Sequence, residues 1–223
     1  MRILNALAVV GGTLLLVVCL IAAGFEMVAL PDGATQILGQ TFANVDDSPY
    51  TKSALVDNGV RTKHYTFNTH DANEIADLIG DANADERRYL TPDAISHLDD
   101  VYKVVSVAQP LLVVAAILCV ACLAHVGVRM GKRSLGTVLM VAGVITLLLF
   151  IGLGAWAAFG FNSLFAMFHS LFFAAGTWTF SYDSLLICMY PIEFWMGMAG
   201  IWLCVSVILS ILCMILGTIL RKR

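Results

Sequence analysis

Two histidines with a nearby carboxylate are the residues best suited to chemistry in this chain. His97 and His169 lie in separate segments, and Asp100 follows His97 by three residues, within reach on a helix. Imidazole has a pKa of about 6.5, so both rings can take and return protons near neutral pH. Asp100 can orient the His97 ring and favour its protonated form. The competing interpretation for His97 is that it lies on a solvated polar helix face. His169 stands among phenylalanines, where a polar side chain usually has a functional or structural role.

Other candidate sites carry weaker signals. Cys119 and Cys122 have the C-x-x-C spacing of quinone-linked thiol oxidoreductases, but they fall in an apolar run without a second cysteine pair, which favours core packing. His64 and His70 lack neighbouring cysteines or a recognisable ligand spacing, so a zinc site has little support. The chain has no Walker loop, dinucleotide fingerprint or Gly-x-Ser-x-Gly elbow. We therefore expect no metal, no cofactor and no nucleic-acid partner.

The elements that hold these residues are set by composition. Hydrophobic residues make up 59% of the chain and charged residues 13%, which is outside the range of soluble domains. A helix needs roughly 20 apolar residues to cross a bilayer. Charge-free runs of that length cover residues 3–24, 104–127, 134–157 and 196–219. The fold class is therefore an all-α integral membrane protein with four transmembrane helices.

Charge predicts the orientation of these helices. Seven basic residues lie near the ends of the apolar runs: one at residue 2, three in the loop 128–133, which includes Arg129, and three in the tail 220–223. All sixteen Asp and Glu residues fall within 25–103 and 158–195. The positive-inside rule then places both termini in the cytoplasm. Residues 1–24 can also be read as a cleaved signal peptide, but their apolar run exceeds the roughly 7–15 residues of a signal core. We favour a retained transmembrane helix.

The two outer segments contain further local signals. Thr91, Pro92 and Asp93 form a helix start, so the segment 25–103 is expected to be an extracellular domain or loop ending in a helix continuous with the second span. The alternation from Lys63 to Thr69 suggests a short strand. In the second outer segment, 158–195, residues 161–173 are apolar but too short to span, which indicates an interfacial or re-entrant helix.

Two stretches resemble a family of bacterial integral membrane proteins that includes lipoprotein intramolecular transacylase. The first, His97-Leu98-Asp99-Asp100-Val101, is similar to the family's His-Leu-x-Asp-Val element. The second comprises Phe165, Phe168-His169, Phe172, Trp178, Phe180, Asp183, Leu186-Ile187 and Tyr190-Pro191. Together the stretches cover about a quarter of the chain. Cys188-Met189 stands where the family pattern has aliphatic residues, and residues 25–90 show no match.

The resemblance implies an acyltransferase that modifies lipoproteins. Its reaction would move the sn-2 acyl chain of a diacylglyceryl-modified lipoprotein to the α-amine of the same lipoprotein's N-terminal cysteine, at the outer face of the bacterial cytoplasmic membrane. Transfer from ester to amide needs a base, oxyanion stabilisation and a proton for the leaving oxygen. We hypothesise that His97, oriented by Asp100, is the base and that His169 stabilises the oxyanion or acts as the acid; the two roles can be exchanged. Trp178, Asp183 and Tyr190 are supporting candidates.

Two other classes remain open from sequence. A non-enzymatic assembly or transport subunit fits four spans, although these spans have almost no ionisable groups to line a polar path. A different acyltransferase or hydrolase acting on phospholipid would use the same two histidines. An intact reaction after His97→Ala and His169→Ala substitution would favour the non-enzymatic subunit over an enzyme. Release of free fatty acid would identify the phospholipid enzyme.

Overall fold

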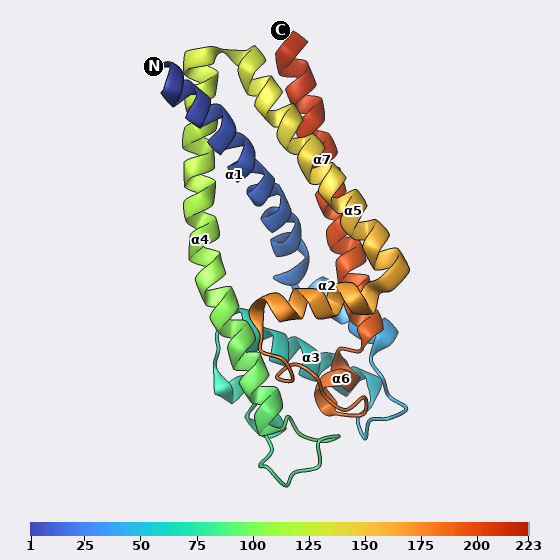
Figure 1. The fold of residues 1–223 in the computed structure, drawn as a ribbon. Coiled ribbons are helices and arrows are strands. Elements are labelled where there is room, and N and C mark those ends of the chain that lie inside the picture. The colour runs from blue at the N-terminus through green and yellow to red at the C-terminus, as the bar shows by residue number, and fades with distance from the viewer. Residues whose placement is uncertain (223) are drawn as a thin grey trace. The chain divides into compact units, whose positions relative to one another are not determined.

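The computed structural model describes residues 1–222, and its regular structure is helical (Figure 1). The elements are α1 (Arg2–Ala29), α2 (Asp32–Phe42), α3 (Lys52–Phe67), the 3-10 turns η1 (Ala72–Glu74) and η2 (Ala76–Leu78), α4 (Pro92–Met130), α5 (Lys132–Phe172), α6 (Leu185–Met189) and α7 (Ile192–Lys222). Across the described chain no strand forms, and Ile79 and Leu90 meet in an isolated bridge.

Four helices, α1, α4, α5 and α7, are long and apolar enough to cross a membrane, which confirms the predicted number of spans. The chain divides into two compact units. The membrane unit comprises Met1–Val28, Ala108–Trp156 and the described residues from Gly200 onward, and the polar unit comprises Ala29–Val107 and Ala157–Ala199. Both histidines of interest belong to the polar unit.

Small residues set the packing of the membrane unit, where α5 runs beside α7 (Figure 1). A Cβ atom on Gly143 would lie 2.8 Å from the Ser210 carbonyl oxygen, and one on Gly217 would lie 2.6 Å from the Gly136 carbonyl oxygen. The two backbones therefore approach as closely as glycine permits. This packing is expected in lipid, where helix association relies on close contact rather than on the hydrophobic effect.

Several polar side chains of the membrane unit are bonded to nearby groups. Thr146 donates to the Ala142 carbonyl one turn earlier at 3.0 Å, and Trp202 Nε1 donates to the Ile21 carbonyl at 3.1 Å. The His125 and Asn5 side chains lie 3.0 Å apart, which links α4 to α1. Such bonds remove the cost of a polar group in hydrocarbon. His125 thus makes an interhelical contact.

A separate hydrophobic core organises the polar unit. Its fully or nearly fully buried members come from α3, the segment before α4, the first turns of α4, and α6: Leu55, Ile75, Leu78, Leu90, Ala94, Leu98, Leu185, Cys188 and Met189. Backbone bonds fasten the same segments, with Leu90 N donating to the Leu78 carbonyl at 2.7 Å and Leu185 N to the Glu86 carbonyl at 2.7 Å. The start of α4 and the chain leading into α6 are therefore held by one core.

The strand expected from Lys63 to Thr69 does not form, and that prediction was wrong. Lys63–Phe67 are the last residues of α3, and Thr51 caps the helix by accepting a bond from Ala54 N at 3.3 Å. The buried positions Leu55, Thr62 and Tyr65 recur at helical spacing along the whole element. A few alternating residues at its end did not outweigh that longer period.

Local signals fix the two helix segments that matter for the site. As the capping pattern predicts, α4 begins at Pro92, where Thr91 Oγ1 accepts from Ala94 N at 3.3 Å. The helix then continues through Pro110 to Met130. At Gly160, α5 has non-helical backbone angles (φ −167°, ψ 60°), so the residues after it form a distinct helical segment that ends at Phe172. This segment carries His169.

Candidate active site

The structure brings His97 and His169 together from two elements of the polar unit. Their ring centroids are 6.2 Å apart and the ring planes differ by 26°. His97 lies in the second turn of α4, where the neighbouring Ala94 and Leu98 enter the core. His169 lies in the last turn of α5. A small molecular group can contact both imidazoles at this separation.

Aromatic side chains enclose the two histidines. The His169 ring lies 4.0 Å from that of Phe165 and 4.9 Å from that of Trp178. The His97 ring lies 5.0 Å from Phe173, edge to face, and 5.7 Å from Phe180. The result is a pair of proton-transfer groups in apolar surroundings, which suits an acyl chain better than a free polar substrate.

Burial keeps both imidazoles in their neutral form. The pKa of His97 is lowered to about 4, mainly by desolvation and also by the positive charge of a protonated His169, while the Asp100 carboxylate opposes the shift. Desolvation also lowers the pKa of His169, partly opposed by its bond to the Phe165 carbonyl. Both residues lie outside the apolar runs predicted to cross the membrane. At pH 7 each ring therefore has a lone pair on one nitrogen and a proton on the other.

Hydrogen bonding assigns the tautomer of His169. Its Nδ1 lies 2.9 Å from the Phe165 carbonyl oxygen, one turn earlier on the same helix. A carbonyl oxygen only accepts, so Nδ1 carries the proton and donates it. The lone pair of the neutral ring is then on Nε2. This is the orientation in which a histidine acts as a base through Nε2.

Two buried polar atoms at this site have no hydrogen-bond partner within residues 1–222: His97 Nδ1 and Trp178 Nε1. Buried polar groups are otherwise almost always paired, because an unmade bond leaves the desolvation cost uncompensated. Both atoms belong to side chains that surround His169. Sequence reasoning named both residues but had no signal for this feature.

Asp100 does not hydrogen-bond the His97 ring. Its Oδ1 accepts from Lys103 Nζ at 2.8 Å, three residues further along α4. Since His97 Nδ1 has no partner in the described chain, Asp100 acts on this ring only through its charge. The nearby lysine reduces that influence. The rings of Phe173 and Phe180 contact the His97 imidazole.

Asp183 and Tyr190 occupy structural positions. Asp183 lies in the turn before α6, and its carbonyl accepts from Cys188 Sγ at 3.5 Å. Burial, together with the Asp47 and Asp183 carboxylates, raises the pKa of Cys188 to about 11. The Tyr190 hydroxyl donates to the Gly59 carbonyl on α3, and burial raises the pKa of Tyr190. These contacts join α6 to its neighbours.

The histidines considered as weak zinc candidates, His64 and His70, contact carboxylates and an aromatic ring. His64 Nε2 lies 2.9 Å from Asp32 Oδ1, which also pairs with Lys63, and His64 Nδ1 lies 3.6 Å from Glu74 Oε2. The hydrogen bond from Lys63 lowers the pKa of Asp32. His70 is stacked on Tyr102 at 3.8 Å. Over the described residues no three potential ligands gather as in a metal centre.

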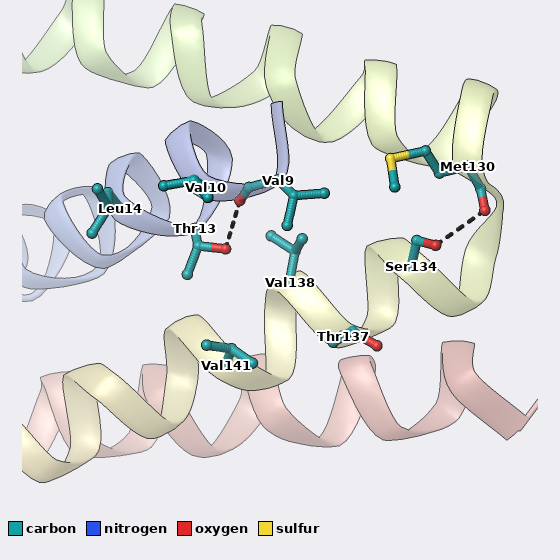
Figure 2. Close-up of a pocket in the computed structure, with 9 residues that line it drawn as sticks. All are labelled: Val9, Val10, Thr13, Leu14, Met130, Ser134, Thr137, Val138 and Val141. Carbon is teal, nitrogen blue, oxygen red and sulfur yellow. Dashed lines mark hydrogen bonds between the residues drawn. The ribbon is translucent and has the colours of Figure 1, made fainter. Parts of the chain in front are cut away.

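A cavity of about 450 Å³ lies in the membrane unit, separate from the residues of the site (Figure 2). Its lining consists of Val9, Val10, Thr13, Leu14, Met130, Ser134, Thr137, Val138 and Val141. Each of the three hydroxyls donates to the carbonyl four residues earlier in the chain, at 2.7 to 3.1 Å. No lining group is ionisable, so this cavity offers no acid or base.

The Phe165, Phe173 and Phe180 rings complete the site; Phe165 and Phe180 belong to the stretch that resembles the family, but none of the three was predicted as a site residue. Phe165, His169 and Phe173 have four-residue spacing, which puts Phe165 on the same helical face as His169. That spacing was the available signal. Phe180 follows α5 in a loop, and only the fold brings it to His97.

Comparisons with known proteins agree on one family. The family model for lipoprotein intramolecular transacylase Lit matches residues 44–195. No curated protein matches. The structure of the membrane integral lipoprotein intramolecular transacylase Lit from Bacillus cereus is similar, with a TM-score of 0.82, 19% identity, and coverage of 100% of this chain and 98% of that one.

Two variants of the Bacillus cereus protein, in which a histidine is replaced by arginine or by alanine, are also similar. Their TM-scores are 0.72 and 0.73 at 19% identity; each match covers 98% of this chain, and 92% and 94% of the respective variant. This identity supports a shared fold, and the family model, which spans more than half of the sequence, supports membership. The chain therefore belongs to the lipoprotein intramolecular transacylase family and is a multi-pass membrane enzyme with a lipoprotein transacylase role.

Proposed function

We propose that this enzyme moves the sn-2 acyl chain of a diacylglyceryl lipoprotein to the α-amine of that lipoprotein's own N-terminal cysteine. His97 and His169 are the catalytic pair. The observation that carries the proposal is the close approach of two half-buried, neutral imidazoles, with ring centroids 6.2 Å apart within a group of aromatic side chains. The product is a lipoprotein with an N-acyl chain and a monoacylglyceryl group.

His169 is the base in this mechanism. Its Nδ1 proton is held by the Phe165 carbonyl, so Nε2 presents a lone pair to the substrate. This favours the exchanged form of the two role assignments considered from sequence. The carbonyl bond also stabilises the imidazolium that forms when Nε2 takes a proton, as a hydrogen-bond acceptor does for other catalytic histidines.

The reaction is a transfer within one substrate. The neutral α-amine attacks the ester carbonyl carbon, a C–N bond forms, and the carbonyl oxygen becomes an oxyanion. His169 Nε2 removes a proton from the attacking nitrogen. The C–O bond to the sn-2 oxygen then breaks, and the His169 proton moves to that oxygen. No water is consumed, and the proton lost by the amine ends on the glyceryl hydroxyl.

His97 polarises the ester carbonyl as a neutral donor. Its pKa of about 4 means that the ring is uncharged at pH 7 and has an N–H available. A neutral imidazole with a lowered pKa can stabilise a developing oxyanion without giving up its proton. The unpartnered Nδ1 is the atom through which this ring can contact the substrate.

The aromatic surroundings favour transfer over hydrolysis. Phe165, Phe173 and Phe180 pack against the two imidazoles and reduce their contact with water. Since the amine and the ester belong to one molecule, an enzyme that holds them in contact gains much of the rate enhancement from their proximity. Exclusion of water protects the tetrahedral intermediate from hydrolysis.

The diacylglyceryl substrate and the surrounding membrane lipid also suit the predicted location. Positive residues at the chain ends and in the loop 128–133 support cytoplasmic termini. The histidines then lie at the outer face of the bacterial cytoplasmic membrane, where a lipoprotein anchored by its acyl chains presents both the ester and the amine.

Mass spectrometry of the N-terminal lipoprotein peptide tests the proposal. The host cells lack their own N-acylating enzyme and express the wild-type chain or a variant. We expect N-acyl, monoacylglyceryl cysteine with the wild type, and at least an approximately 10²-fold slower conversion with His97→Ala or His169→Ala. His125→Gln is the matched control, because glutamine can keep the contact with Asn5.

Wild-type conversion by either alanine variant, at equal expression, would contradict the assigned roles. Release of free fatty acid in place of the amide would identify a hydrolase. Wild-type cells that retain only the diacylglyceryl peptide with a free amine would refute the transfer itself.

A further inference from the structure

Trp178 has a hydrogen-bond donor that the fold does not use. Its Nε1 atom is buried and has no partner within the described residues. Trp195 Nε1 donates to the Tyr190 carbonyl at 3.1 Å, and Trp202 Nε1 donates to the Ile21 carbonyl at 3.1 Å. A buried indole normally finds such a partner. The difference suggests that the partner of Trp178 is a bound molecule.

The indole lies beside the proposed base. The Trp178 and His169 ring centroids are 4.9 Å apart, with 35° between the planes. In the proposed mechanism the α-amine nitrogen of the substrate contacts His169 Nε2. In the transition state this amine nitrogen is bonded to the carbonyl carbon of the ester. Its oxyanion is one bond further away. A donor on a ring adjacent to His169 is therefore at a suitable distance from the oxyanion.

The segment that carries Trp178 has a defined backbone. Thr177 N and Oγ1 donate to the Ala174 carbonyl at 3.3 and 3.0 Å. Between them, Gly176 has φ +86°, a left-handed conformation that favours glycine. Phe180, two residues after Trp178, packs against the polar-unit core. The turn and this anchor hold the indole in position before a substrate arrives.

We propose that Trp178 Nε1–H donates a hydrogen bond to the ester carbonyl oxygen and stabilises the oxyanion of the transferring acyl group. This inference rests on the proposed transacylation. Indole N–H is a donor only, so it cannot take a proton from the amine, but it can donate a hydrogen bond to a carbonyl oxygen that gains negative charge. Trp178 and neutral His97 then provide two donors to one oxygen, an arrangement that stabilises tetrahedral intermediates.

Replacing the N–H without changing the ring shape tests this role. Trp178 is replaced by 3-benzothienylalanine, which has sulfur in place of N–H, and separately by phenylalanine. We expect kcat of the purified enzyme on a diacylglyceryl lipopeptide to fall about 10²- to 10³-fold in both variants, with KM nearly unchanged. Trp202→Phe is the control: it loses a structural bond and is expected to keep its kcat.

Nuclear magnetic resonance provides a readout independent of turnover. The chain has four tryptophans, hence four indole N–H signals, and the Trp178 signal is assigned from its loss in the Trp178→Phe variant. Addition of a diacylglyceryl lipopeptide with an acetylated amine gives a complex that cannot react. We expect the Trp178 proton to move downfield on binding, while the Trp202 proton does not move.

A wild-type kcat in the 3-benzothienylalanine variant would overturn the proposal, even if the Trp178→Phe variant is slow. Trp178 would then only pack against the substrate. An unmoved Trp178 signal in the saturated complex would overturn it as well. Failure of the proposed function appears differently, as undiminished turnover in His97→Ala or His169→Ala.

Discussion

At the scale of single residues, desolvation determines the chemistry of the site. His97 and His169 have an ordinary pKa of about 6.5 in water, close to neutral pH. The aromatic rings that surround them lower the pKa of both, and the Phe165 carbonyl selects the proton-bearing nitrogen of His169. Neutral form and tautomer are therefore consequences of the neighbouring side chains and backbone.

The lowered pKa of His97 predicts acid destabilisation. The folded protein resists protonating this ring down to about pH 4, whereas the unfolded chain protonates it below about 6.5. The unfolded state thus binds more protons in that window, and the free energy of unfolding falls as pH is lowered through it. His169, also with a lowered pKa, contributes in the same direction.

The measurement is the melting temperature in detergent at pH 7.5 and pH 5. We expect the wild type to lose more than His97→Phe, which has no titrating ring at this position. Asp32 and Asp77 have lowered pKa values and lose their ionic contacts only below about pH 4, so they add little to the difference. Equal losses in the two proteins would contradict this account of His97.

At the scale of elements, close backbone contact joins α5 and α7. Buried small residues line the contact, among them Gly136, Gly143 and Gly217. In lipid such contacts replace the hydrophobic driving force that joins helices in water. The pair also connects the chain regions before and after the segment that carries His169 and Trp178.

Adding one methyl group to α5 tests this packing. In Gly143→Ala the new Cβ would lie 2.6 Å from Met214 Cγ and 2.8 Å from the Ser210 carbonyl oxygen, so the helices must separate. We expect a loss of about 1–3 kcal/mol in the free energy of unfolding. Gly152→Ala is the matched control, since nothing lies within 4 Å of its Cβ.

Thermal unfolding in one detergent compares the two alanine variants directly. Gly152→Ala is expected to equal or slightly exceed the wild type, because alanine favours the helix more than glycine does. Equal melting temperatures for the two variants would show that the α5–α7 contact is not close in the membrane-extracted protein.

At the scale of the whole molecule, charge distribution predicts how the chain crosses the membrane. The acidic residues all lie in the two segments expected outside, and the basic loop at 128–133 is expected inside. With residues 1–24 counted as a span, the number of spans is even, and both ends are expected on one side. The orientation predicts opposite accessibility for loops on the two sides.

Cysteine labelling in intact cells measures this orientation. In a chain whose six cysteines are replaced, a single cysteine is introduced at the exposed position Asn83 or Lys132. A membrane-impermeant maleimide should label Asn83→Cys in intact cells and Lys132→Cys only after permeabilisation. The reverse pattern would place the histidines on the cytoplasmic side and exclude the proposed site of action.

The sequence by itself determined the features that depend on local composition. Four apolar runs specify four spanning helices because each must bury its backbone bonds within one segment. Thr91 and Pro92 determine where α4 begins, and a histidine amid phenylalanines marks His169 as unusual. These properties are encoded within a few turns of chain.

Only the tertiary structure decided the features that depend on distant neighbours. It brought His97 within 6.2 Å of His169, paired Asp100 with Lys103, and left Trp178 Nε1 without a partner. The alternating residues at the end of α3 became helical because the polar-unit core buries that helix. Burial and unsatisfied hydrogen bonds depend on what the rest of the chain places nearby, so spacing along the sequence does not specify them.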